Sequence, residues 1–395
     1  MKSKKPREMG KILPALCIAL LLALTAAGCG TTTSAKTMLE LNQEYSAMTV
    51  VESSGGVKMD ITLSNTVNDR LGSEMEQLLD MFKQISYSSK SDQVNMTGDV
   101  AIQAGGSELL RLVMDGPGGA YYVGIAGFID MARNFEAATG DAESASEPSL
   151  SKELAADLRG NQWIKFELPD DSKYLAGREL LADYLLGLDN EVFTDFDSGF
   201  VKAVSGGFEF KVTYEQLGAY VQSLGGYILE NLDKFVNYTK TFLQGLTEEQ
   251  MSAFGLTADM RDKVINELDT FVAPENKTLY ENNLAMAVQV IQTPDVAKIF
   301  GGSYIDLKLT KSGETFTWAC DLLVNLNFAG SSIGALFGVD FGDNSIRFTF
   351  DEQAKPLASF TPEIPASGVI DAGDTKYFTV SDMGYPMINP YATVE

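Results

Sequence analysis

The chain of 395 residues contains no histidine, and this absence removes several kinds of chemistry. Histidine titrates near neutral pH and is the commonest metal ligand in proteins. Without it, Ser-His-Asp and Cys-His nucleophiles are excluded, as are zinc and iron sites with histidine ligands. Carboxylate pairs, Ser-Lys dyads and calcium sites remain open. We therefore expect a protein that is not an enzyme and that needs no metal or cofactor.

Cysteine is almost as scarce, with three residues at Cys17, Cys29 and Cys320. The first two lie near the N-terminus, and Cys320 stands alone in an apolar stretch. A chain of this length can bury a core without disulfides. We expect Cys320 to behave as a small buried hydrophobe and not as a reactive thiol.

Basic residues are few: 30 Lys and Arg stand against 54 Asp and Glu, a net charge of −24 at pH 7. Such a charge repels nucleic acid and anionic membrane surfaces, so we expect the folded body to bind neither. Most of the acidic surplus is expected to form solvated surface. With this many carboxylates, the sequence cannot select a pair at the separation that glycosidases need.

Three local patterns suggest binding loops but lack the residues that such loops require. Residues 195–199 and the group Asp340, Asp343 and Asn344 do not supply the oxygen ligands and closing Glu of a calcium loop. Residues 116–119, Gly-Pro-Gly-Gly, are not followed by Gly-Lys-Ser/Thr and do not open a helix. We expect solvated loops at the first two and a hairpin turn at the third.

The N-terminus is divided into a basic start, an apolar run over 12–27 and small residues before Cys29. This order is typical of a secretory signal. The apolar run is shorter than the roughly 20 residues of a transmembrane helix, and Pro14 interrupts it. We therefore expect residues 1–28 to be a signal peptide.

The segment Leu24-Thr25-Ala26-Ala27-Gly28-Cys29 resembles the lipobox of bacterial lipoprotein precursors. The resemblance implies cleavage before Cys29 and lipidation of its thiol, with residues 29–46 as a flexible tether. The protein would then be extracytoplasmic, with the membrane as its partner: lipid-anchored to the outer face of the cell membrane, or to the outer membrane of a diderm host. In a diderm host, Gly30 would disfavour retention at the inner membrane. The alternative is an ordinary secretory signal without lipidation.

Alternating apolar residues predict strands in the first half of the chain. They cover 57–63, 94–102, 109–114, 120–124 and 163–168. Residues 69–86 have helix-like spacing and predict a helix or a helical loop. Residues 136–160 are biased towards Ala, Glu and Ser, and predict a loop with a short helix at 150–158.

The middle of the chain, 172–272, is predicted to be mainly helical, with one strand at 208–212 and a last helix that ends before Pro274. Strands are expected again at 304–309, 316–320, 322–328 and 346–350. The proline-bearing end predicts an irregular tail at 381–395. The order of strands, helices and strands predicts an α+β fold, and short turns predict antiparallel pairing. We expect a single domain over 47–380, with one curved antiparallel sheet, an unclosed half-barrel, and the helices packed on its concave face.

The order of these segments resembles the LolA-like and LppX/LprG-like lipoproteins. A lipobox precedes alternating strands, an Asp-Gly turn leads to Tyr121-Tyr122-Val123, and a Trp-Ile-Lys-Phe-Glu-Leu strand follows. The resemblance implies a half-barrel that wraps around helices and encloses an apolar cavity for lipid or acyl chains. It assigns no binding residue to a position in this chain.

Methionine on the predicted strands suggests where such a cavity would be lined, because its flexible side chain suits apolar ligands. The alternative is that these residues are ordinary core. The lipid-binding hypothesis competes with a cell-envelope scaffold or interaction protein that binds no ligand. An ABC-type solute receptor is less favoured, because the chain lacks repeated βα units. The candidate lining residues are Met59, Met96, Leu112 and Met114.

Overall fold

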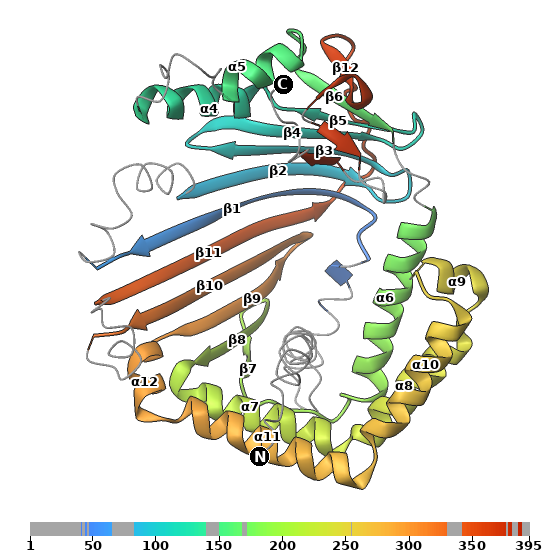
Figure 1. Ribbon diagram of the computed structural model, residues 1–395, viewed down its shortest axis with the longest axis vertical. Coiled ribbons are helices and arrows are strands. Elements are labelled where there is room, and N and C mark those ends of the chain that lie inside the picture. The colour runs from blue at the N-terminus through green and yellow to red at the C-terminus, as the bar shows by residue number, and fades with distance from the viewer. Residues whose placement is uncertain are drawn as a thin grey trace, which may run out of the picture. The chain divides into compact units, whose positions relative to one another are not determined.

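The computed structural model describes residues 41, 44, 45, 47–64, 83–139, 150–167, 172–253, 255–329, 342–376, 378–380 and 386–388 (Figure 1). The chain divides into two compact units. The helical unit comprises Met1–Gln43 and Ser172–Asp306, and the sheet unit comprises Glu44–Asp171 and Leu307–Glu395. This division does not test the expectation of one domain over 47–380, which stays a prediction.

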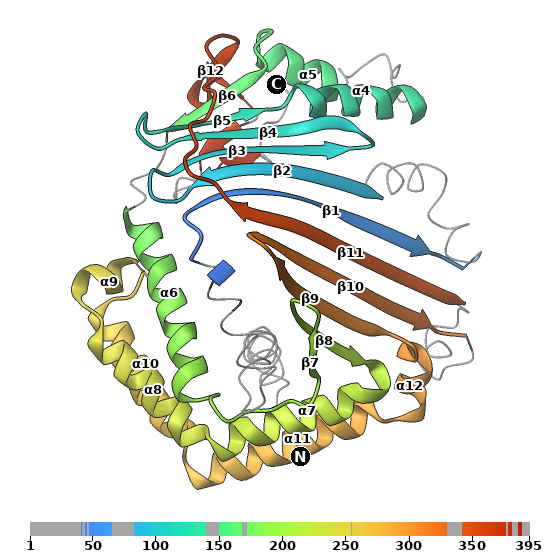
Figure 2. The same cartoon turned by 180° about the vertical axis from the view of Figure 1, so that it is seen from behind.

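The sheet unit is built on an open sheet in the order β12-β6-β5-β4-β3-β2-β1-β11-β10-β9, seen from its two sides in Figures 1 and 2. Neighbours from β6 to β10 pair antiparallel, and β12 joins β6 in parallel. The boundary between the units falls inside β9. The strands are β1 (Val50–Thr62), β2 (Gln84–Asp92), β3 (Thr97–Ala104), β4 (Ser107–Asp115), β5 (Ala120–Gly124), β6 (Trp163–Glu167), β9 (Tyr304–Ser312), β10 (Thr315–Asn327), β11 (Asp343–Pro356) and β12 (Val369–Asp371).

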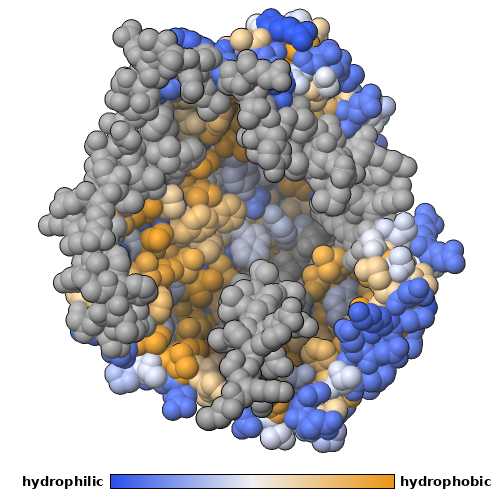
Figure 3. Space-filling view, viewed as in Figure 1, coloured by the Kyte–Doolittle hydropathy of each residue, from blue (hydrophilic) through white to orange (hydrophobic). Residues whose placement is uncertain are grey.

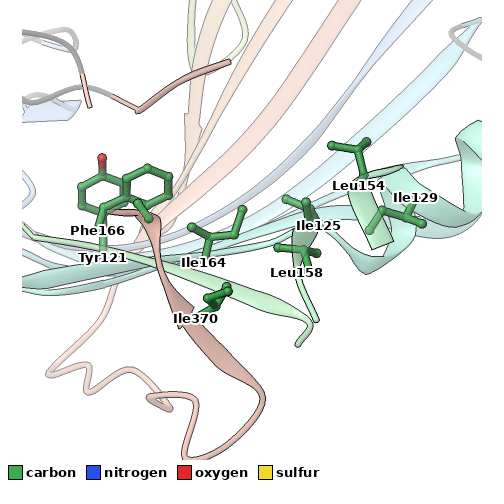
Figure 4. Close-up of a cluster of buried hydrophobic side chains, with 9 residues drawn as sticks. Tyr121, Ile125, Ile129, Leu154, Leu158, Ile164, Phe166 and Ile370 are labelled. Atoms are coloured by element: carbon green, nitrogen blue, oxygen red, sulfur yellow. The ribbon is translucent and has the colours of Figure 1, made fainter. Parts of the chain in front are cut away.

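Two helices, α4 (Ala126–Thr139) and α5 (Leu150–Asp157), complete the core of the sheet unit. The backbone N–H and hydroxyl of Ser151 both donate to the carboxylate of Glu136, which joins the two helices. Figure 4 shows the aromatic rings of Tyr121 and Phe166 side by side, with stacked ring centroids 4.9 Å apart. The core cluster comprises Tyr121, Ile125, Ile129, Leu154, Leu158, Ile164, Phe166, Ile370 and Ala372.

The helical unit contains two short strands, β7 (Val201–Val204) and β8 (Gly207–Thr213), which pair antiparallel. Lys211 on β8 forms an ion pair with Asp306 at the start of β9, with 3.0 Å between Nζ and Oδ2. Helix starts follow local chemistry: the Thr257 hydroxyl accepts a hydrogen bond from the Met260 N–H. The helices are α6 (Ser172–Glu191), α7 (Tyr214–Glu230), α8 (Leu232–Gly245), α9 (Glu248–Ala253), α10 (Ala258–Phe271), α11 (Pro274–Ile291) and α12 (Pro294–Phe300).

The α+β class and the mainly antiparallel sheet confirm the prediction. The strand at 208–212 and the helices at 150–158 and before Pro274 are also confirmed. Pro274 begins α11 and Pro294 begins α12, because proline fits the first turn of a helix, where no backbone N–H is needed. The helical region therefore continues through α11 and α12, beyond the predicted end.

Two predicted boundaries in the sheet unit are wrong. Residues 84–86, placed in a helix, form the start of β2, while residues 65–82 lie outside the described part of the chain. The strand predicted from Val94 starts at Thr97, because the Asp92 carboxylate accepts hydrogen bonds from the N–H groups of Val94 and Asn95 and closes a turn. Met96 in this turn has a φ of +52°.

The expected signal peptide at 1–28 and nearly all of the tether lie outside the described residues. Within the predicted irregular tail, Pro386–Ile388 forms β14, which pairs with β13 (Phe378–Val380). No helix in the described part of the chain combines the length and the hydrophobicity that crossing a bilayer requires.

Candidate functional site

One face of the sheet unit is lined by apolar side chains from four adjacent strands. The strand register places Ile85, Val57, Phe350 and Cys320 in one row across the sheet. Because alternate residues of a strand share a face, the next rows extend the same surface. We call this set the apolar face; it comprises Ile85, Val57, Met59, Ile61, Ile346, Phe348, Phe350, Cys320, Leu322 and Val324.

The apolar face differs from the core cluster in its exposure. Its side chains are partly buried, and Ile346 is 37% exposed, whereas Ile164 and Phe166 in the core cluster are fully enclosed. Figure 3 shows hydrophobic residues gathered over strands β1, β11 and β10 in the view of Figure 1. A contiguous apolar surface of this kind is typical of a binding site for a ligand or a partner.

A polar cluster lies at one end of the apolar face. The Tyr45 hydroxyl donates a hydrogen bond to the Glu352 carboxylate, with 3.3 Å between the oxygens. The Tyr45 ring packs edge-on against Phe316, with ring centroids 5.7 Å apart. Tyr87 on β2 reaches towards the same carboxylate across β1. We call Tyr45, Tyr87 and Glu352 the tyrosine–glutamate cluster.

Gly55 on β1 leaves room for this cluster. It lies in the same row as Tyr87 and Glu352. A Cβ atom added at Gly55 would lie 3.0 Å from a ring carbon of Tyr87 and 2.2 Å from the Asp351 carbonyl oxygen. The bare backbone therefore lets the Tyr87 ring cross β1.

Burial and the neighbouring carboxylate keep both tyrosines of the cluster protonated. Burial, followed by the charge of Glu352 and the hydrogen bond to it, raises the pKa of Tyr45 to about 12. The pKa of Tyr87 is raised by burial and then by the same carboxylate. Both phenols are therefore neutral donors at physiological pH, and the negative charge of the cluster resides on Glu352.

The structure separates the four sequence-predicted lining residues. Met59 lies in the apolar face on β1. Leu112 and Met114 lie on β4, partly buried against the core cluster. Met96 lies in the turn before β3, where its carbonyl accepts a hydrogen bond from the Gly116 N–H near the end of β4. Met96 is thus close to Met114 and far from Met59, because β2 and β3 lie between β1 and β4.

Sequence reasoning missed the tyrosine–glutamate cluster. Glu352 continues the alternation of the strand predicted at 346–350, which in the structure extends to Pro356. Tyr87 belongs to β2, for which no strand was predicted; the helix or helical loop predicted over 69–86 covers only the first three residues of β2. The one sequence signal for this strand is the alternation of Ile85 and Tyr87 with serines. Cys320 lies partly buried in the apolar face, and Cys29 lies outside the described residues.

The opposite face of the same strands carries a polar groove of about 590 Å³. Glu52 bridges Lys90 and Lys355, with N–O distances of 3.3 and 2.8 Å. Hydrogen bonds from these two lysines hold the pKa of Glu52 below its usual range. Arg111 and Asp99 form a bidentate pair at 2.9 and 2.7 Å. The groove therefore presents charge pairs and serines, in contrast to the apolar face.

Among the described residues, no group of three or more cysteine, aspartate or glutamate side chains is placed to hold a metal ion. Comparison of this chain with protein-family models, with curated proteins and with solved structures gives no match.

Proposed function

We propose that the protein is an exported lipoprotein, tethered through Cys29, that binds a lipid or another apolar ligand on the apolar face of its sheet. In this proposal the fold is LolA-like: the sheet acts as an unclosed half-barrel, and helices on its concave side complete the cavity. The observation that carries the proposal is the partly exposed apolar face.

The energetics of apolar surface favour a ligand there. Each methylene group removed from water contributes about 0.8 kcal/mol, so a ligand chain that covers the face gains several kcal/mol from the buried carbons. The rows from Phe350 to Ile346 are continuous across β1, β11 and β10, and these three strands place no charged side chain on this face between them. A flexible chain can therefore lie along β11 without desolvating a charge.

The proposed location of the protein outside the cytoplasm rests on its N-terminal sequence. The small residues Ala26, Ala27 and Gly28 before Cys29 support lipidation of that thiol, and the tether that follows would hold the folded body close to the bilayer. A lipid ligand would then be available within the reach of the tether.

The competing function is a cell-envelope scaffold that binds no ligand. Native mass spectrometry of the mature protein with Cys29 replaced by serine separates the two functions. We expect masses in excess of the polypeptide that disappear after organic extraction, and an extract that contains lipid. A protein that has the bare polypeptide mass, and that does not take up an added apolar dye, would favour the scaffold.

A further inference from the structure

We propose that the tyrosine–glutamate cluster selects apolar ligands whose polar end donates hydrogen bonds, such as a hydroxyl or an ammonium group, and disfavours ligands that end in a free carboxylate. This inference rests on the proposed function, because it assigns the headgroup position for a ligand on the apolar face.

The cluster lies where the apolar face ends. Tyr87 stacks on Phe350, with ring centroids 6.4 Å apart and an interplanar angle of 8°. In the other direction along the strands, the next row contains Ser89 and Ser53 together with Ala354 and Phe316, and the last three of these are buried. On β11, the partly exposed apolar side chains thus end at the carboxylate of Glu352. A ligand with one apolar and one polar end therefore fits in a single orientation.

The length of the face suits a long chain. Glu352 and Ile346 lie on the same strand and face, six residues apart in sequence. At about 3.4 Å per residue this span is about 20 Å, comparable to a long extended acyl chain. A chain that reaches the Ile346 row would hold its polar end next to Glu352.

The carboxylate has spare capacity for such a headgroup. A carboxylate offers about four acceptor positions, and the Tyr45 hydroxyl occupies one of them. Tyr45 is a neutral donor and leaves the negative charge of Glu352 in place. A hydroxyl or an ammonium group can therefore add a donor, whereas a second carboxylate meets a like charge.

The lysines nearest the cluster are engaged in ion pairs. Lys311 forms an ion pair with Glu44, and its ammonium lies 5.0 Å from the centre of the Phe316 ring. Lys90 and Lys355 lie on the opposite face, where both contact Glu52. On the apolar face, the charge that a ligand headgroup meets is therefore that of Glu352.

The test uses three amphiphiles of equal chain length: dodecanol, dodecylammonium and dodecanoate. Each displaces an apolar fluorescent dye from the Cys29→Ser protein, below the micelle concentration and at neutral pH. We expect the alcohol and the ammonium to bind about tenfold more tightly than the carboxylate, the scale of a charge interaction in a partly screened site. Glu352→Gln should reduce this preference to less than about twofold.

The matched control is Glu52→Gln, which removes a carboxylate from the other face of the sheet and should leave the ranking unchanged. The ranking in the protein that retains Glu352 tests the inference even if Glu352→Gln does not fold. Equal binding of the three amphiphiles, or a preference that survives Glu352→Gln, would overturn the headgroup assignment but leave apolar binding intact. If neither the dye nor any amphiphile binds, the proposed function itself fails.

Discussion

The aromatic rings of Tyr87 and Phe350 are nearly parallel, with centroids 6.4 Å apart, although β1 separates the strands that carry them. Gly55 on β1 makes this arrangement possible because it has no side chain. We predict that Gly55→Ala lowers the free energy of unfolding by about 2 kcal/mol, since the new methyl group overpacks the row. Urea denaturation measures the change.

Gly56→Ala is the matched control for this substitution. It places a methyl group on the opposite face of β1, 3.3 Å from the nearest atom, the Ile85 carbonyl oxygen. We expect a smaller loss of stability than for Gly55→Ala. Equal losses would show that Gly55 has no special role in seating the Tyr87 ring.

Met59→Glu should abolish uptake of apolar ligands and leave the protein folded. Met59 is partly buried in the apolar face, where a carboxylate would disrupt a surface that an apolar chain needs. Lys58→Glu, on the other face of the same strand, should bind normally. Dye binding and circular dichroism measure the two properties, and unchanged dye affinity in a folded Met59→Glu protein would count against the apolar face.

Leu112→Glu should have a different effect, namely a large loss of stability. Leu112 packs against the core cluster that includes Ile164 and Phe166. A charge there is desolvated without a partner, so we expect destabilisation of about 3 kcal/mol or more. Thermal unfolding of Leu112→Glu and Met59→Glu distinguishes a core residue from a site residue. Similar melting temperatures would contradict this distinction.

Cys29→Ser should release the protein from the membrane fraction, because the substitution removes the thiol that the lipobox resemblance marks for lipidation. Fractionation and labelling with a fatty-acid analogue measure the outcome. Cys320→Ser is the control and should remain membrane-bound and labelled. Retention of Cys29→Ser in the membrane, together with the absence of label in the natural protein, would refute the anchor.

Stability should decrease at alkaline pH, in part through Tyr45. The pKa of Tyr45 is raised from 10.0 to about 12 in the folded protein. A group with a raised pKa stabilises the fold fully below its unfolded pKa, and this contribution is lost as pH rises through the folded pKa. Tyr45→Phe should therefore flatten the fall in stability between about pH 10 and 12. Denaturation curves at intervals across this range provide the test, and an identical slope in both proteins would contradict it.

Two adjacent glycines on α7 offer a test within the helical unit. A Cβ at Gly226 meets nothing within 4 Å, whereas a Cβ at Gly225 would lie 2.5 Å from a methyl group of Leu284 on α11. Gly226→Ala should stabilise the unit by roughly 0.5–1 kcal/mol through helix propensity. Gly225→Ala should gain less or lose stability, because Leu284 must move. Thermal unfolding that ranks Gly225→Ala above Gly226→Ala would contradict the close approach of the two helices.

The fold class could be predicted because it depends on periodicity that single segments carry. Residues 57–63 and 346–350 alternate clearly, and the structure places both on paired strands. β2 was missed because its alternating positions are mostly serines, which weaken the apolar signal of Ile85 and Tyr87. The strand predicted to start at Val94 starts instead at Thr97, because hydrogen bonds from the Val94 and Asn95 N–H groups to the Asp92 carboxylate hold these residues in a turn.

The candidate site was harder to predict than the fold. Met59 could be placed on an apolar surface from its neighbours in sequence. The tyrosine–glutamate cluster could not be predicted, because its members come from three distant segments. The strand register brings Tyr87 and Glu352 into one row, and Tyr45 joins them through its hydrogen bond to Glu352. Local patterns also could not separate Met59, on a partly exposed face, from Leu112, against the core, since both occupy alternating strand positions.

The pairing of β1 with β11 has a consequence for the assembly of the protein. β1 lies near the start of the chain and β11 near its end, yet they are adjacent in the middle of the sheet. If the chain is exported from its N-terminus, β1 reaches the far side of the membrane long before its partner. Its unpaired edge would then be a site for mispairing until residues 343–356 emerge, so maturation should be slow and sensitive to truncation at the C-terminal end.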